Sequence, residues 1–307
     1  MGSEVLVSLV EKRHAPHLHC QVLIDPLASA GHGEHALLAR LRDALGEGAL
    51  TRVQRADLAE APHLHPVLVC LARPGATPSR SLLELTARAA QNGLYQRRRY
   101  LCGWLFSEAP PATIAAHIAA LCRVPDAQRA FSFYPVYEPV RLELLAATFK
   151  QAEQGPWWPI DNWLFLSSGG RLVNLRGQGG PRHALPGPAL RIQADGVLVE
   201  RVLAGWRVLR ASTTDASQCQ IPAFAAVRAS NHIDDARGLG LSNAEDIVVL
   251  ALHQLCIHPR LHTLSEVRSL IDGACSGQQA LAPLLARYSE AHWRRLTESL
   301  SKSERRL

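Results

Sequence analysis

Long apolar segments are missing from this 307-residue sequence. No run reaches the roughly 18 apolar residues that a membrane-spanning helix needs, so we predict no membrane span. The N-terminal segment MGSEVLVSLVEKRH has an acidic residue where a secretory signal peptide is positively charged, and its apolar run is short. These absences predict a cytoplasmic protein.

Cysteine spacing of the kind that marks a disulfide framework is also missing. The seven cysteines are an odd number, and they are scattered through mostly apolar segments. Such cysteines are typical of buried thiols. We therefore expect them to be reduced, in keeping with a reducing cytoplasm.

Nucleotide-binding motifs and a strong basic charge are lacking as well. Neither the phosphate loop G-x-x-x-x-G-K-S/T nor the fingerprint G-x-G-x-x-G occurs. HGE at 32–34 resembles the start of a zinc deaminase motif, but no P-C-x-x-C follows. Basic residues exceed acidic ones only by 33 to 27, and RRR at 97–99 is typical of a solvated loop. We expect no nucleic acid partner; a nucleic-acid-binding module stays an alternative that rests on this charge alone.

The residues that are present predict a folded core of alternating strands and helices. Hydrophobic residues make up 47% of the chain, which excludes global disorder. The expected strands are 20–25, 66–71, 100–107 and 130–134, and the expected helices are 34–45, 79–91, 111–123 and 139–153. This alternation predicts an α/β N-terminal lobe in which helices flank a mixed sheet.

Beyond Trp163 the composition changes. Residues 169–188 are rich in Gly, Pro and Arg and predict a hairpin followed by a loop, whereas the chain from Ile221 onward is nearly all helical in pattern. Two capping boxes that would begin its helices are Ser242-x-x-Glu245 and Thr263-x-x-Glu266. The predicted parts are an α/β lobe at 1–170, a hairpin and linker region at 171–214, and a smaller all-helical lobe at 215–307.

One pentapeptide has the form of a nucleophile elbow. GACSG, residues 273–277, would place Cys275 as the nucleophile. An elbow lies between a strand and a helix, but the preceding EVRSLID predicts a helix, so we expect a turn between helices instead. A cysteine hydrolase stays an alternative function.

Histidines cluster near the N-terminus in HAPHLHC. The candidate zinc ligands are His14, His17, His19 and Cys20, with His63 and His65 further along the chain. The chain holds 14 histidines in all, which weakens the signal of any one group. We therefore expect no metal and no other cofactor, with a metal-dependent hydrolase as the alternative.

Tryptophans gather in GPWWPIDNWLF. Buried tryptophans complete cores and exposed ones anchor partners, and the pattern favours the core. Trp157 and Trp158 remain candidates for partner binding.

An ordered set of segments resembles a known family. A strand ending in Ser, CGWLFS, is followed by a helix with His and Arg, HIAALCRV, and by an aromatic strand. Next come the corner Tyr137-Glu138-Pro139, a Leu-rich helix, and the Pro159, Ile160 and Trp163 segment. In this order they resemble the effector adaptor/chaperone family of the bacterial type VI secretion system.

The resemblance implies a non-catalytic cytoplasmic adaptor without a cofactor. It would hold a toxic effector protein and load it onto the spike protein before export. Two departures matter: the family's Arg before the corner is Pro135 here, and its Asp is Glu138. The salt bridge that the Arg would form is therefore not expected.

The corner also has a physical interpretation. An acid followed by Pro predicts a helix start, because the carboxylate accepts unpaired N–H groups and Pro at the first position loses no bond. We predict that Tyr137, Glu138 and Pro139 form a structural joint between sheet and helix.

The helical lobe offers three arginines for partner contacts. Clefts that receive a helix or an extended segment have apolar floors and charged rims. We expect Arg260, Arg268 and Arg287 at such a rim, where they would favour an acidic cargo.

Overall fold

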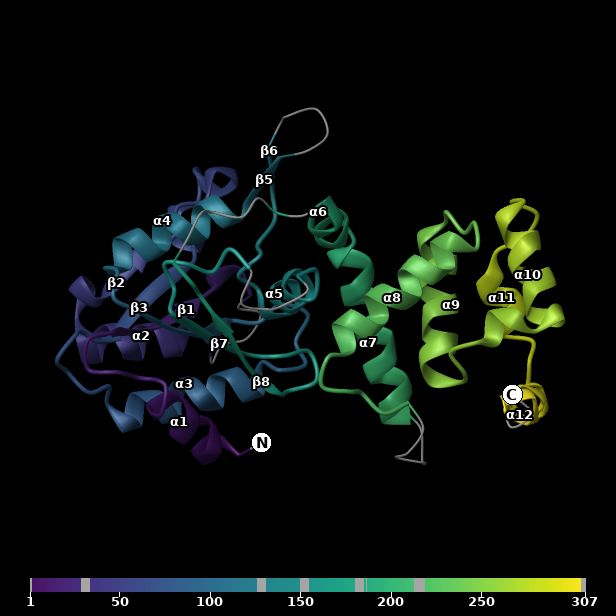
Figure 1. Cartoon of the computed structure of the whole chain (residues 1–307), viewed down its shortest axis with the longest axis horizontal. Helices are drawn as coiled ribbons and strands as arrows, with labels where there is room; N and C mark the ends of the chain where they lie inside the picture. Colours follow the sequence, from purple (N-terminus) through teal and green to yellow (C-terminus); the bar gives the residue numbers. More distant parts are fainter. Residues whose placement is uncertain are drawn as a thin grey trace. The chain divides into compact units, whose positions relative to one another are not determined.

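The computed structural model describes residues 2–28, 34–125, 131–149, 155–179, 185, 187–212 and 219–304. The chain divides into two compact units, Met1–Ala194 and Asp195–Leu307 (Figure 1). The first unit contains a sheet covered by helices and the second consists of packed helices. The predicted two-part fold is confirmed.

The main sheet of the first unit has six strands in the order β2-β3-β1-β4-β7-β8. Their bounds are β1 His19–Ile24, β2 Leu50–Arg52, β3 Val67–Ala72, β4 Leu101–Ser107, β7 Asn162–Leu166 and β8 Leu172–Arg176. A separate ribbon pairs β5 (Arg123–Pro125) with β6 (Phe131–Phe133). The predicted strand at 130–134 is therefore present, but it lies outside the main sheet.

Each pair of neighbouring strands in the main sheet is antiparallel, which corrects the expectation of a mixed sheet. The cause is that another strand is inserted between the two parallel strands of each crossover. The helical crossover from β3 to β4 gives two strands that run the same way, as the alternation predicts, but β1 lies between them. In the same way β3 lies between β1 and β2.

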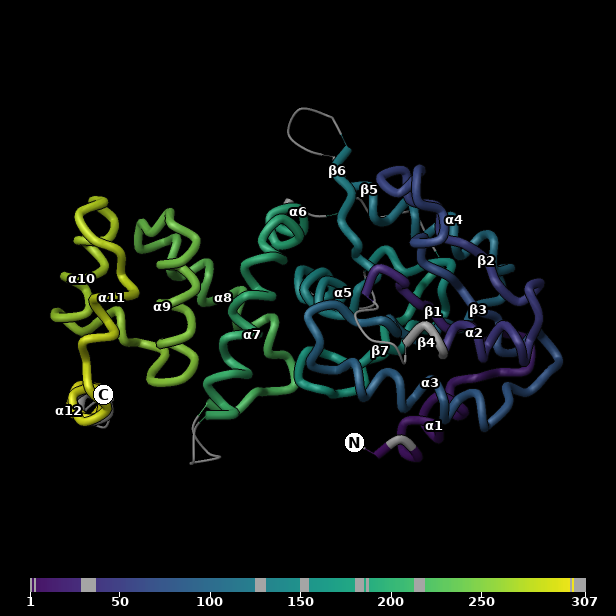
Figure 2. Tube along the Cα trace, turned by 180° about the vertical axis from the view of Figure 1, so that it is seen from behind, coloured from purple at the N-terminus to yellow at the C-terminus, as the bar shows by residue number. Residues whose placement is uncertain are grey.

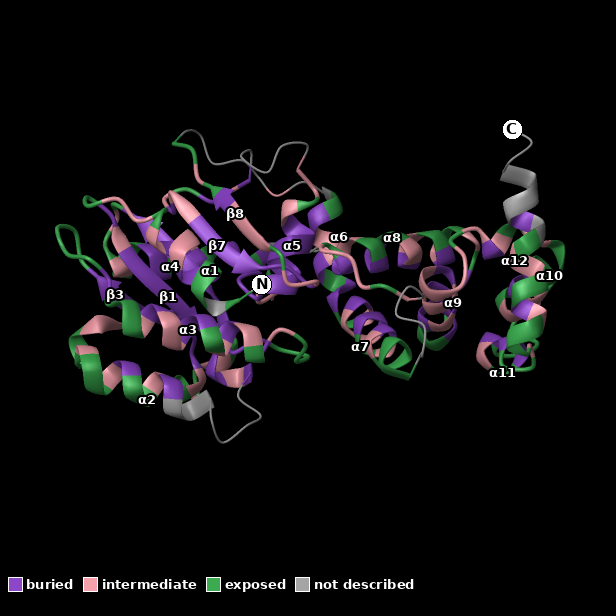
Figure 3. Ribbon diagram, turned by 90° about the horizontal axis from the view of Figure 1, so that it is seen from below, coloured by how far each residue is buried: buried purple, intermediate pink, exposed green. Residues whose placement is uncertain are grey.

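Helices cover both faces of this sheet. Those of the first unit are α1 Ser3–Glu11, α2 Glu34–Leu45, α3 Arg80–Asn92, α4 Pro111–Leu121, α5 Pro139–Ala146 and α6 Gly187–Ala194. Helices α1, α2 and α3 share one hydrophobic cluster with one face of the sheet, and α4 and α5 share a second cluster with the other (Figure 2). Because both faces are buried, the central strands are apolar at successive positions (Figure 3).

The second unit is built from α7 Gly196–Ser212, α8 Ala225–Gly238, α9 Ala244–Cys256, α10 Ser265–Cys275, α11 Leu281–Leu285 and α12 Glu290–Glu304. The cap of α9 is Asn243, whose side chain accepts from the N–H groups of Glu245 and Asp246 at 2.8 and 3.3 Å. The capping box predicted at Ser242 is therefore wrong by one residue. Helix α10 has Leu264 at its start and no side-chain cap, so the second predicted box is also wrong.

A disulfide joins Cys219 and Cys256 within the second unit. The expectation that every cysteine is a thiol is therefore wrong for this pair, because two cysteines 37 residues apart carry no pairing signal in the sequence. The thiols of Cys20, Cys70, Cys102 and Cys122 are buried as expected, and Cys275 is exposed.

The hairpin and linker region predicted at 171–214 is divided between the two units. Strand β8 completes the sheet of the first unit by pairing with β7, and α7 belongs to the helical unit. Among the described residues, no helix is long and apolar enough to cross a membrane.

Gly103 allows β4 and β7 to approach closely. Its φ is +152°, and a Cβ there would lie 2.5 Å from the carbonyl oxygen of Leu164. We predict that Gly103→Ala lowers the free energy of unfolding by about 1–3 kcal/mol, as overpacking does. Urea unfolding measures this. Gly48→Ala is the control, because a Cβ at Gly48 meets nothing within 4 Å; equal losses in both variants would contradict the prediction.

Candidate functional site

The corner predicted from the sequence lies at the start of α5. One carboxylate oxygen of Glu138 accepts from the N–H groups of Val140 and Arg141 at 2.9 and 3.2 Å. Glu138 is therefore the N-cap, and Pro139 occupies the first helical position. Tyr137 and Glu138 are buried, so the corner lies inside the unit.

Helix α5 is buried along most of its length although it carries charged residues. The carboxylate of Glu143 accepts from the N–H and the hydroxyl of Ser168 at 2.6 and 2.9 Å. The guanidinium of Arg141 donates to the carbonyl of Gln193 at 2.7 Å, and the Gln193 amide donates back to the Arg141 carbonyl at 3.0 Å. Internal hydrogen bonds therefore compensate for the burial of these two side chains.

Arg99, the last residue of RRR, is buried, so the prediction of a solvated loop is wrong at this position. Its guanidinium donates to the carbonyls of Leu166 and Ser167. Burial lowers the pKa of Arg99, and the carboxylates of Glu138 and Glu143 act in the opposite direction. Arg99 thus balances negative charge around α5.

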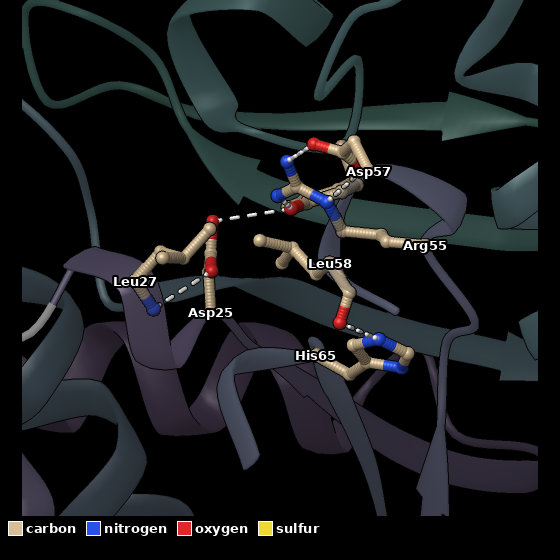
Figure 4. Close-up of polar contacts among 7 residues, drawn as sticks. Asp25, Leu27, Arg55, Asp57, Leu58 and His65 are labelled. Carbon is tan, nitrogen blue, oxygen red and sulfur yellow. Dashed lines mark hydrogen bonds and ion pairs between the residues drawn. The ribbon is translucent and has the colours of Figure 1, made fainter. Parts of the chain in front are cut away.

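A largely buried polar network that includes Asp25, Arg55 and Asp57 (Figure 4) is joined to the corner through the hydroxyl of Tyr137. The hydroxyl of Tyr137 donates to the carboxylate of Asp25 at 3.2 Å and accepts from Arg55 at 2.8 Å. Arg55 also donates two bonds to Asp57, at 2.7 and 3.2 Å. His65 lies nearby, with Nε2 3.0 Å from the carbonyl of Leu58.

This network has a structural role, because its titratable groups Asp25 and Tyr137 are buried. Burial raises the pKa of the Asp25 carboxyl, while the N–H of Leu27, the charge of Arg55 and the hydroxyl of Tyr137 oppose the rise. Burial also raises the pKa of Tyr137 well above its usual value. Asp25 is 3% exposed and Tyr137 is 0% exposed, so an external substrate cannot reach either group in this conformation.

An open groove of about 730 Å³ borders the network. It is lined by Thr51, Arg52, Gln54, Arg55, Ala56, Ala59, Pro62, His65, Ala112, Ala115, Ala116, Ala119, Ala120, Arg123 and Phe133. The guanidinium of Arg55 lies 4.3 Å from the ring centre of Phe133, and that of Arg123 lies 4.7 Å from Phe131. We call this the alanine groove; its lining is mostly apolar, Arg55 lies buried within it, and the exposed Arg52 and Arg123 form its rim.

The tryptophan candidates separate in the structure. Trp157 is fully buried and meets Phe149 edge-on at 6.0 Å, so it belongs to the core and its candidacy for partner binding is corrected. Trp163 is also fully buried, whereas Trp158 is 44% exposed and stays available for a partner.

The three candidate arginines of the helical unit lie on separate elements. Arg260 is half-buried and precedes the short 3-10 helix η6 (Leu261–Thr263). Arg268 lies on α10 and forms an ion pair with Asp272 at 3.0 Å. Arg287 follows α11 and is exposed.

The catalytic and metal candidates are not assembled into a site. Cys275 is the last residue of α10, so GACSG spans the end of a helix and does not follow the strand that an elbow requires. His17 lies 3.6 Å from Glu108, and His19 lies 3.9 Å from Cys70. Within the described ranges no three His, Cys, Asp or Glu residues could hold one metal ion. His32 and Gly33 of HGE lie outside those ranges.

No protein-family model, curated protein or solved structure matches this chain.

Sequence reasoning missed Asp25, Arg55, Asp57 and the buried Arg99. Asp25 had a usable signal, since a lone carboxylate directly after the apolar strand β1 is a natural candidate for burial. Arg55 and Asp57 lie in a segment without periodicity, and their partner Tyr137 is 82 residues from Arg55.

The two carboxylates of the network should have opposite effects on stability as the pH changes. The folded state raises the pKa of Asp25, so this group stabilises most below its usual pKa of about 3.9 and less as the pH rises. The hydrogen bond from Arg55 lowers the pKa of Asp57, so that group stabilises at higher pH. We predict that Asp25→Asn gains stability relative to wild type as the pH rises above about 4. The stability deficit of Asp57→Asn relative to wild type should be fully present above about pH 4 and should shrink as the pH falls below it. Parallel pH profiles of urea unfolding for the two variants would contradict this.

The cap at the corner has a measurable contribution. Glu138→Ala leaves the N–H groups of Val140 and Arg141 without their acceptor, so we expect the free energy of unfolding to fall by about 0.5–2 kcal/mol. Glu138→Asp keeps a carboxylate and serves as the conservative control. If the corner is a joint, partner binding weakens only as far as unfolding explains; an unchanged melting temperature with abolished binding would instead identify an interface.

Proposed function

We propose that this chain is a non-catalytic adaptor that binds a secreted effector and helps load it onto the spike protein of a type VI secretion system. The effector and the spike protein are taken from the family that the ordered segments within residues 100–165 resemble. The proposal includes a cytoplasmic location in the donor cell and no cofactor.

The observation that carries the proposal is the contrast between the corner and the alanine groove. At the corner, Tyr137 and Glu138 are buried and bonded internally, as in a rigid scaffold. The neighbouring groove is open and mostly apolar, which suits the binding of another protein. This contrast favours binding over catalysis.

The segments behind the resemblance occur as ordered elements. They are β4 ending at Ser107, α4 with His117, the aromatic β6, the corner, α5, and the turn that leads to Trp163 on β7. His117 Nε2 lies 3.0 Å from the carbonyl of Pro156, which ties α4 to that turn. The segments thus form one packed body, as a shared scaffold would.

The helical unit is proposed to supply cargo specificity. Arg268 and Arg287 are exposed and favour an acidic cargo surface.

Disulfides are uncommon in the reducing bacterial cytoplasm, so the Cys219–Cys256 bond is the observation that weighs against a cytoplasmic location.

The proposal is tested with the full chain and the products of its neighbouring genes. We expect the tagged chain to co-purify with a toxin and a spike protein encoded beside it. The double variant Arg268→Glu/Arg287→Glu should weaken toxin binding by roughly threefold to tenfold, and less so at high salt, because exposed charges are screened. Arg88→Glu, an exposed change on α3, is the control. Failure of both neighbouring products to co-purify would contradict the adaptor function, and an unaffected double variant would contradict the role of the arginines.

A further inference from the structure

We propose that the alanine groove binds an amphipathic α-helix of a partner protein, apolar along one face and carrying carboxylates beside that face. The inference rests on the protein-binding part of the proposed function but not on the secretion partners. It follows from the floor of the groove, its opposite wall and its charges.

The floor is the outward face of α4. This helix buries Ile114, Ile118 and Leu121 against the sheet, and it leaves alanine methyl groups on the side away from it. The exposed or half-buried alanines that line the groove from this helix are Ala112, Ala116, Ala119 and Ala120, beside the buried Ala115. Spacings of three and four residues place them in one row along the helix. Because a methyl group is small, a second helix can pack at the short end of the usual 8–10 Å axial distance.

The opposite wall is also built from small apolar residues. Segment 51–65 contributes Ala56, Ala59 and Pro62, and all three are exposed. Figures 1 and 2 show the neighbouring strand β2 alongside α4. The small side chains of α4 and of Ala56, Ala59 and Pro62 leave an open channel between them, which a ridge of larger apolar side chains can fill.

Of the two buried polar side chains in the lining, Arg55 is engaged, and His65 is engaged through Nε2 while its Nδ1 has no partner among the described residues. Arg55 donates to Asp57 and Tyr137, and His65 is bonded to the carbonyl of Leu58. A small-molecule site needs several convergent polar groups that fix the orientation of the ligand. An apolar helical face needs none, so the lining favours a helix.

Strand addition is disfavoured at this place. The sheet edge beside the groove is β2, which has only three residues, Leu50–Arg52. An extended peptide obtains its affinity from main-chain hydrogen bonds along an exposed edge, and three residues offer few of them. A helix makes no use of that edge.

The charge of the rim selects acidic flanks. Arg52 and Arg123 are exposed, and in the described part of the chain neither forms an ion pair. The carboxylate of Asp57 is engaged by Arg55. A helix with carboxylates beside its apolar face complements the two arginines, and one with lysines is repelled.

The test is selection from a library of displayed helical peptides with the full-length chain as bait. Positions on one face vary among Ala, Val, Leu and Phe, and flanking positions vary among Glu, Gln and Lys. We expect enrichment of Glu over Lys at the flanks. Binding of a selected peptide should weaken at least tenfold in Ala116→Glu, which places a charge on the apolar floor. Ala204→Glu, an exposed change on α7, is the matched control.

The double variant Arg52→Glu/Arg123→Glu gives a second, independent readout. It leaves the apolar floor intact. When this variant is the bait, selection should enrich Lys in place of Glu at the flanking positions. Circular dichroism and thermal unfolding establish that each variant is folded; if Ala116→Glu is not, Ala112→Glu replaces it on the same face. Three outcomes would each overturn the proposal. They are a selection that enriches no helical peptide, equal binding by Ala116→Glu and the control, and enrichment of the same flanking charge by wild type and the double arginine variant. None of these outcomes depends on co-purification of a toxin or spike, so the adaptor function is judged separately.

Discussion

The hydroxyl of Tyr137 is the point at which three parts of the first unit meet. It donates to Asp25, directly after β1, and accepts from Arg55 in the segment after β2. Tyr137 itself directly precedes Glu138, the N-cap of α5. Because all three side chains are buried, removing one deprives another buried polar group of a hydrogen bond. The network therefore fixes the corner and segment 51–65, one wall of the alanine groove, relative to each other.

Helix α5 shows how charged side chains can occupy an interior without a reactive role. Glu138 caps its own helix, Glu143 binds Ser168, and Arg141 binds Gln193. The partners of Glu143 and Arg141 lie on two other segments, so these two charges specify which segments pack around the helix. This is a use of buried polar groups for specificity of packing.

Local features of the fold could be predicted from the sequence, and features that depend on distant partners could not. The pattern at 34–45 gave the bounds of α2, Glu34–Leu45, and the acid–Pro pair predicted the cap at Glu138. The strand directions could not be predicted, because they depend on which strand is inserted between the members of each crossover. Arg99 looked solvated because its acceptors, the carbonyls of Leu166 and Ser167, lie more than sixty residues away.

The candidate site was predictable only in part, for the same reason. Trp157 and Trp158 are adjacent and alike in the sequence, and only packing against Phe149 separates the buried one from the exposed one. The alanine groove has no motif: its two walls come from segments about fifty residues apart, and the alanines of α4 read as ordinary helix formers.

The central position of β1 has a consequence for synthesis of the chain. Both of its neighbours, β3 and β4, follow it in the sequence, and the second is complete only at Ser107. At typical elongation rates this takes on the order of ten seconds after β1 has been made. During that interval the apolar segment HCQVLI has no strand on one or both of its edges. The nascent chain is therefore most prone to mispairing before β4 emerges from the ribosome.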